Sequence, residues 1–193
     1  MRSTFRASCA ALTLLVLPLW TALPAHAFEL QGEHTLTAHP RSGEGDPVVL
    51  GQVVFEPQAD GSARFSIRFE HGVFTDHFLS MKEFKCIGGA VELACHVPYP
   101  YPQPATVRAG DWRWLEHSLL FLYKQPREFG AKLWNGLYYR FEVDGGRLVG
   151  RPQAIDLNRI SAPPDRPGEP PYRPALRDDI PAGARWLDRL VID

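Results

Sequence analysis

The sequence predicts a mainly β fold: an antiparallel sandwich or incomplete barrel of about seven strands, with a helical insert near 111–134 and a Pro-rich C-terminal extension. Three observations support this prediction. Several segments alternate apolar and polar residues, as half-buried strands do. Short connections rich in turn residues separate them, and these favour antiparallel neighbours because parallel neighbours need long crossovers. Residues 112–123 instead have the spacing of a helix.

The first 27 residues are expected to be a cleaved secretory signal. Arg2 and Arg6 precede an apolar run, no acidic residue occurs before Glu29, and the run leads to Ala25-His26-Ala27. A basic start, a short apolar centre and small residues at the end are the three parts of such a signal. The alternative is an uncleaved anchor, but the run is roughly 14 residues and contains Pro18, whereas a membrane span needs about 20. We therefore expect a periplasmic or secreted protein.

The remaining chain is divided into a β-rich domain, residues 28–160, and an extension with a C-terminal docking segment, residues 161–193. Cleavage removes two of the 21 basic residues and none of the 22 acidic ones, which leaves a formal charge of −3. No basic block appears, so the sequence gives no reason to expect nucleic acid or an anionic membrane surface as a partner. No transmembrane segment is expected in the mature chain, because it has no further long apolar stretch. No cofactor is expected, and the oligomeric state stays open.

The predicted strands begin at the mature N-terminus. Residues 28–38 alternate, with His34 on the apolar face, and 48–55 form a second strand. Asp60-Gly61 supplies the positive φ of a hairpin connection before the strand 63–69, which has the cleanest alternation in the chain. Residues 78–87 are expected to be extended with one break in their alternation, and 91–97 alternate again.

The chain changes character after residue 97. Prolines alternate with other residues over 98–104, which favours an extended, polyproline-like conformation. Asp111 fits an N-cap, and apolar residues at three- and four-residue spacings predict a helix over 112–123. Pro126 favours a second short helix that ends near Asn135-Gly136. Residues 137–143 and 148–157 are expected to pair as a hairpin.

The C-terminal part holds seven prolines between Ser161 and Pro181. Such a stretch has too little apolar content to fold alone and should lie extended over the surface. The apolar residues Trp186, Leu187, Leu190 and Val191 are expected to dock the C-terminus on the body.

Cys86 and Cys95 are expected to form a disulfide, because an even pair in an oxidising compartment is most simply crosslinked. A two-residue turn at Gly88-Gly89 would hold the cysteines too far apart, so the bond requires a wider loop centred near Ala90 and Val91. A metal site of Cys86, Cys95 and His96 is the alternative. It lacks the second short-spaced ligand pair of structural zinc sites, so no metal is expected.

Two groups of residues offer catalytic chemistry. Asp76, His77 and Ser80 are the residue types of an orienter, a base and a nucleophile, but adjacent strand residues point to opposite faces. Glu116 and His117 are adjacent on the predicted helix, where neighbours diverge by about 100°. No strained-serine elbow accompanies either group.

Aromatic residues offer a binding site. Five of them are expected to line a cleft beside the helical insert: Tyr99, Tyr101, Trp112, Trp134 and Tyr138. Aromatic faces in a concave site bind a small molecule or an extended peptide, although the same rings would also serve as ordinary core.

Three functions follow from these features. The favoured one is an exported, non-enzymatic binding module with an aromatic-lined cleft. The first alternative is a hydrolase acting in the envelope or outside the cell. The second is a structural or assembly partner in the envelope that uses residues 161–181.

Overall fold

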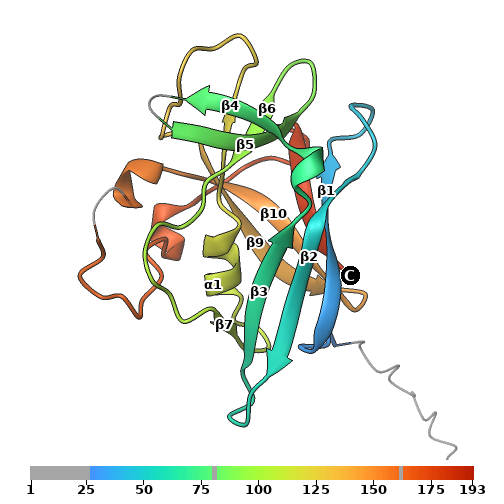
Figure 1. The fold of residues 1–193 in the computed structure, drawn as a ribbon, viewed down its shortest axis with the longest axis vertical. Coiled ribbons are helices and arrows are strands. Elements are labelled where there is room, and N and C mark those ends of the chain that lie inside the picture. Colours follow the sequence, from blue (N-terminus) through green and yellow to red (C-terminus); the bar gives the residue numbers. More distant parts are fainter. Residues whose placement is uncertain (1–26, 80–81, 161–162) are drawn as a thin grey trace, which may run out of the picture.

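The structure is a computed structural model, and it describes residues 27–79, 82–160 and 163–193 (Figure 1). Residues 1–26 of the predicted signal lie outside the described residues. None of the described helices is long and apolar enough to cross a membrane.

The described chain is mainly β, as the sequence predicts. Its strands are β1 (Gly32–Pro40), β2 (Val48–Pro57), β3 (Ala63–Phe69), β4 (Thr75–Leu79), β5 (Lys82–Gly88), β6 (Leu93–His96), β7 (Thr106–Val107), β8 (Phe121–Lys124), β9 (Gly136–Asp144), β10 (Arg147–Ile155), β11 (Asp178–Asp179) and β12 (Leu187–Ile192). The helices are α1 (Arg113–Ser118) and three short 3₁₀ turns, η1 (His71–Val73), η2 (Leu157–Ile160) and η3 (Pro174–Leu176).

These strands form one open antiparallel sheet, which does not match the predicted sandwich or incomplete barrel of about seven strands cleanly. The order is β4-β5-β6-β8-β9-β10-β12-β1-β2-β3-β7, and β11 pairs with β10 outside this path. The predicted strand count was wrong for two physical reasons. The expected extended segment 78–87 is part of a hairpin, β4 with β5, and several strands are too short to show an alternation.

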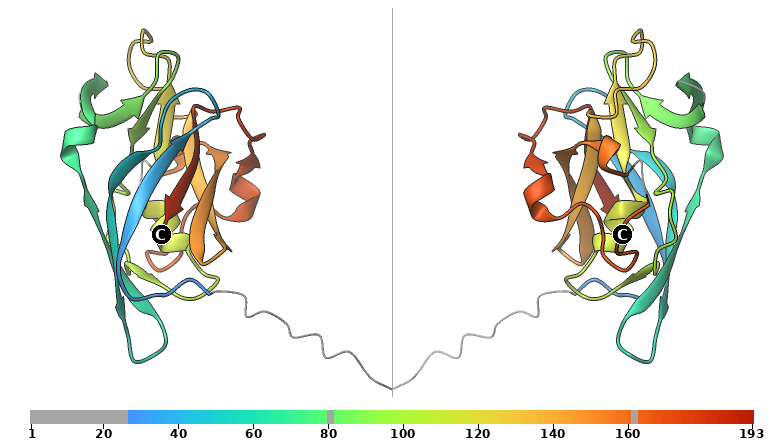
Figure 2. Two further views of the ribbon diagram at one scale, coloured as in Figure 1. Left: turned by 90° about the vertical axis from the view of Figure 1, so that its right-hand side faces the viewer. Right: turned by 90° about the vertical axis from the view of Figure 1, so that its left-hand side faces the viewer.

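The sheet curls strongly, so that strands distant in its order face each other across α1 (Figures 1 and 2). The ring of Phe69 on β3 lies 4.7 Å from the ring of His96 on β6. Gly51 helps β2 to bend beside a register shift against β1: its φ is +148°, and a Cβ there would lie 2.0 Å from the carbonyl oxygen of Arg68. Only glycine fits this close approach of two backbones.

The concave side of the sheet encloses the larger core. Fully buried side chains from most of the strands meet Leu115 and Leu119 of the α1 segment there; they include Leu36, Leu50, Val53, Phe55, Phe121, Leu137, Tyr139, Leu148, Leu187 and Leu190. Burial of this apolar surface is the main contribution to stability.

A second core lies on the other side of β6, β8 and β9. Its members include Cys86, Cys95, Leu122, Tyr138 and Tyr172. Tyr172 comes from the Pro-rich segment: its backbone N–H donates to Nε2 of His117 (3.1 Å), and its hydroxyl donates to the carbonyl oxygen of Asp156 (3.0 Å). The segment expected to lie over the surface is thus anchored by one buried tyrosine.

The helical insert is much smaller than predicted. α1 ends at Ser118, whereas the predicted helix continues to residue 123. Residues 121–124 instead form strand β8, which lies between β6 and β9. The four residues from Leu119 to Leu122 are all buried, and a continuous apolar run of this kind suits a buried strand as well as a helix. The second predicted helix, near 126–135, is a loop.

The hairpin of β9 and β10 and the turn at Asp60-Gly61 agree with the predictions. The C-terminus docks more deeply than expected, because β12 is a central strand that pairs with both β10 and β1.

Candidate functional site

Four loops meet at one end of the curled sheet and surround a hollow. They are residues 41–47, 89–92, 125–135 and 180–186; the first three are visible at the top of Figure 1. The hollow has a volume of about 660 Å³, and we call it the loop-end pocket. Its lining residues are Arg41, Val91, Glu92, Tyr123, Lys124, Gln125, Arg127, Glu128, Lys132, Asn135, Ala184, Arg185 and Trp186.

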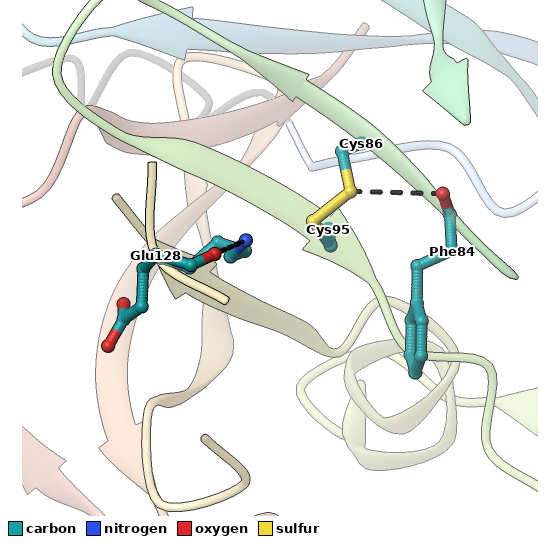
Figure 3. Close-up of a disulfide and its surroundings, with 5 residues drawn as sticks. Phe84, Cys86, Cys95 and Glu128 are labelled. Carbon is teal, nitrogen blue, oxygen red and sulfur yellow. Dashed lines mark hydrogen bonds between the residues drawn. A yellow bond between two sulfur atoms is a disulfide. The ribbon is translucent and has the colours of Figure 1, made fainter. Parts of the chain in front are cut away.

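A disulfide fixes the 89–92 loop beside this pocket (Figure 3). Cys86 and Cys95 lie directly opposite each other on β5 and β6, and their sulfurs are bonded. The backbone N–H of Gly89 donates to the carbonyl oxygen of Glu92 (3.1 Å), which closes a loop centred on Ala90 and Val91. Both the disulfide and the wide loop that it requires are therefore confirmed. The alternative metal site does not form from these residues, because both sulfurs are used in the bond.

Glu92 organises one wall of the pocket. Its Oε1 accepts from the backbone N–H of Trp186 (2.8 Å), and its Oε2 forms an ion pair with Arg185 (3.1 Å). The guanidinium carbon of Arg185 lies 4.0 Å from the ring centroid of Tyr123. The arginine is thus held by a carboxylate and by an aromatic face, so its position is set before any ligand arrives.

Lys124 places a buried cation against the pocket. Lys124 is only 4% exposed, and its ammonium donates a hydrogen bond to the backbone carbonyl of Glu128. This hydrogen bond is the dashed line at Glu128 in Figure 3. An ammonium has three donors, and this carbonyl is its one hydrogen-bond acceptor among the described residues. Burying a charge with so few partners is costly unless a further partner is present.

The 125–135 loop is tied at its base. The backbone carbonyl of Asn135 accepts a hydrogen bond from the backbone N–H of Tyr123 (3.0 Å). The side-chain amide of Asn135 donates to the backbone carbonyl of Tyr123 (3.2 Å). Within the loop, Lys132 pairs with Glu128. A long loop whose ends are held together is a compact surface unit that often carries function.

The loop-end pocket has an excess of positive charge. Five basic side chains line it, against two acidic ones. Both acidic side chains are already engaged, Glu92 with Arg185 and Glu128 with Lys132. Arg41 pairs with Glu44 outside the lining, whereas Arg127 has no ion pair or side-chain hydrogen bond in the described part of the chain. A concave site lined by one sign of charge concentrates ions of the opposite sign.

Two of the three predicted catalytic residues around His77 lie in the described residues. Asp76 is exposed on β4 and pairs with Lys85 of β5. His77 is half-buried and lies opposite Phe84 in the β4–β5 ladder. Ser80 lies outside the described residues.

Glu116 and His117 are both buried in α1 and make structural hydrogen bonds. Glu116 accepts from the hydroxyl of Tyr138 and from the backbone N–H of Phe141 (2.8 Å). The Nδ1 of His117 is hydrogen bonded to the carbonyl oxygen of Arg113 (2.6 Å), so it carries the proton, and Nε2 accepts from the backbone N–H of Tyr172. Each ring nitrogen is therefore already used.

Burial governs the titration of this pair. Desolvation raises the pKa of Glu116, partly offset by its two hydrogen bonds. The pKa of His117 is lowered to about 4, mainly by desolvation; the hydrogen bond to the carbonyl oxygen of Arg113 opposes this, and the charges of Arg177 and Arg113 add to it. At neutral pH His117 is thus a neutral side chain that links α1 to the Pro-rich segment.

The five predicted cleft aromatics lie in three different places. The rings of Tyr99 and Tyr101 are neighbours, with centroids 5.8 Å apart, and the ring of Tyr99 also contacts that of His117. His117 in turn contacts the ring of the buried Tyr138, at a centroid distance of 5.2 Å. Trp112 is buried against Phe28 in the larger core. Trp134 is 64% exposed on the 125–135 loop.

A smaller hollow of about 330 Å³ lies over Glu116, with Arg113, Arg140 and Arg177 on its walls. Arg113 pairs with Asp111, and Arg140 pairs with Glu142. Two of its three arginines are therefore paired with carboxylates, and its lining holds two acidic side chains, Glu116 and Glu142.

The residues of the loop-end pocket were not found by reasoning from the sequence. One sequence feature could have indicated part of this pocket: the three cations Lys124, Arg127 and Lys132 lie close together in the chain. Arg41 and Arg185 come from loops more than 140 positions apart, and only the pairing of β1 with β12 brings them together.

Comparison with protein-family models, with curated proteins and with solved structures found no match for this chain. Its function is therefore inferred from the loop-end pocket alone.

Proposed function

We propose that the protein is an exported, non-enzymatic binding module that holds a small oxyanion-bearing molecule in the loop-end pocket. The observation that carries the proposal is that five basic side chains line this pocket against two carboxylates, and that Lys124 and Arg127 have no ion pair in the described residues. Guanidinium and ammonium groups bind phosphoryl, sulfuryl and carboxylate oxygens through charge-assisted hydrogen bonds.

The construction of the pocket supports this function. The disulfide, the Glu92 contacts and the Asn135 contacts hold three of its segments in place. A ligand that meets a preorganised site loses less free energy to ordering of side chains and loops. The buried ammonium of Lys124 also gains an acceptor when an oxyanion occupies the pocket.

Export is supported by the leader pattern of residues 1–27 and is compatible with the disulfide, which persists in oxidising compartments. The hydrolase alternative has less support. One of its two candidate bases, His117, is buried with both ring nitrogens engaged, so it has no free nitrogen to accept a proton from a substrate. The other, His77, belongs to a group whose Ser80 lies outside the described residues.

Isothermal titration of the mature protein with inorganic phosphate, sulfate and citrate tests the proposal. We expect at least one anion to bind, and the double variant R127Q/K132Q to bind it about ten-fold or more weakly. The matched control is R166Q/R173Q, which removes two exposed cations of the Pro-rich segment and should bind as the wild type does. No heat with any anion, or equal affinity in R127Q/K132Q, would overturn the proposal.

A further inference from the structure

Exposed apolar side chains occur on two of the loops that form the loop-end pocket. Phe129 is 96% exposed, Trp134 is 64% exposed and Val91 is 54% exposed. Phe129 and Trp134 belong to the 125–135 loop, and Val91 lies on the neighbouring 89–92 loop. Large exposed aromatic residues are unfavourable in water, and grouped exposed apolar residues mark interaction sites.

The same loop carries the cations of the pocket. Arg127 and Lys132 alternate in sequence with Phe129 and Trp134, so basic and aromatic side chains leave one short segment together. Tryptophan and phenylalanine beside arginine and lysine are the residues that bind the interface of an anionic bilayer. The aromatic rings enter the headgroup region while the cations contact phosphates.

The shape of the molecule allows such a contact. The 125–135 loop projects beyond the sheet at the top of Figure 1, and it is again the outermost part in both views of Figure 2. The 89–92 loop lies next to it at the same end. A flat surface can therefore meet the tips of both loops together.

The distribution of charge favours an anionic surface over a neutral one. The lining of the pocket carries three more basic than acidic side chains, although the whole chain has a formal charge of −1. The rest of the molecule is therefore net negative and is repelled by an anionic membrane, which orients the loop end toward it. The sequence shows no basic block because Lys124, Arg127 and Lys132 are separated by other residues, and Arg41 and Arg185 come from distant segments of the chain.

We propose that the loop end docks on an anionic phospholipid surface, with Phe129 and Trp134 in the headgroup region and a headgroup phosphate in the loop-end pocket. This inference rests on the proposed function and names the source of its oxyanion. The contact is peripheral and reversible, since two aromatic rings and a few cations supply limited binding energy.

Flotation with phosphatidylglycerol vesicles and with phosphatidylcholine vesicles tests the inference. We expect the mature protein to float with phosphatidylglycerol, to bind phosphatidylcholine much more weakly, and to be released by salt. Quenching of tryptophan fluorescence by brominated phosphatidylglycerol should show that an indole enters the bilayer.

Two variants separate the surface from the pocket. F129S/W134S should lose vesicle binding by about ten-fold or more while still binding inorganic phosphate, because burial of each aromatic ring is lost but the cations stay. R127Q/K132Q should lose both. V143S, which changes an exposed apolar residue at the β9–β10 hairpin, is the control and should bind vesicles as the wild type does.

The inference fails if F129S/W134S floats as well as V143S, or if phosphatidylcholine and phosphatidylglycerol bind equally. Phosphate binding without any vesicle binding would overturn this inference and leave the proposed function standing. Loss of vesicle binding in F129S/W134S but not in R127Q/K132Q would point to an apolar partner instead and would also overturn it.

Discussion

The contact between His117 and Tyr172 makes a specific prediction about stability and pH. In the folded chain, burial holds the pKa of His117 at about 4, against 6.5 for the unperturbed group. Protonation would place a charge in a buried site and would remove the acceptor for the backbone N–H of Tyr172. The folded state therefore binds this proton less tightly than the unfolded state does.

The sign and size of the effect follow from linkage. Because the unfolded state binds more protons between these two pKa values, the free energy of unfolding should fall as pH falls from about 6.5 to about 4. At 1.36 kcal/mol for each pKa unit, His117 alone should account for a loss of about 3 kcal/mol. Burial also lowers the pKa of His96, which acts in the same direction, whereas the raised pKa of Glu116 acts in the opposite one.

The variant H117Q isolates the contribution of His117. Glutamine offers Tyr172 an acceptor but does not titrate, so the other buried groups affect both proteins alike. We expect urea unfolding to show the wild type more stable than H117Q at pH 7, and this advantage to shrink by about 3 kcal/mol at pH 4. A stability difference that stays constant from pH 7 to pH 4 would refute the reasoning.

Three further variants, one of them with a matched control, test the structure. Replacing Cys86 and Cys95 by alanine should lower the free energy of unfolding by about 3 kcal/mol, because the unfolded chain is no longer constrained by the closed loop. Equal urea midpoints with and without the disulfide would contradict this. Y138F should cost about 1–3 kcal/mol in urea unfolding, since the buried carboxylate of Glu116 loses a donor; an unchanged midpoint would mean that this bond contributes nothing. G51A should lower thermal stability by about 2 kcal/mol or more, because its Cβ would meet the backbone of β3. G43A shares a positive φ but meets no atom within 4 Å, so an equal loss in both variants would contradict the close approach at Gly51.

The parts of the fold that the sequence predicted are those with a clear local pattern. The strand 63–69, the Asp60-Gly61 turn and the β9–β10 hairpin each show alternation or turn chemistry that acts over a few residues. The even pair of cysteines in a chain expected to be exported predicted the disulfide, and strand geometry predicted the width of the loop that it closes.

The parts that it missed depend on tertiary contacts. The run from Leu119 to Leu122 is buried on both sides, so its spacing cannot separate a helix from a central strand. The C-terminal residues 187–192 form a central strand because they pair with the edges of both β10 and β1, which are distant in the sequence. A local pattern contains no information about which distant strands will be neighbours.

The candidate site was missed for the same reason. The prediction concentrated on aromatic residues, and most of these rings fill the two cores. The cations of the loop-end pocket are ordinary surface residues when taken one at a time, and they become a site only where the curled sheet brings four loops together.

The most direct test is a titration of the ¹⁵N-labelled mature protein with inorganic phosphate, followed by NMR. If the loop-end pocket binds oxyanions, the largest amide shift changes should fall within residues 89–92, 124–135 and 183–186, and they should saturate. Absence of saturable changes there, or changes centred on Glu116 and His117, would contradict binding at this pocket.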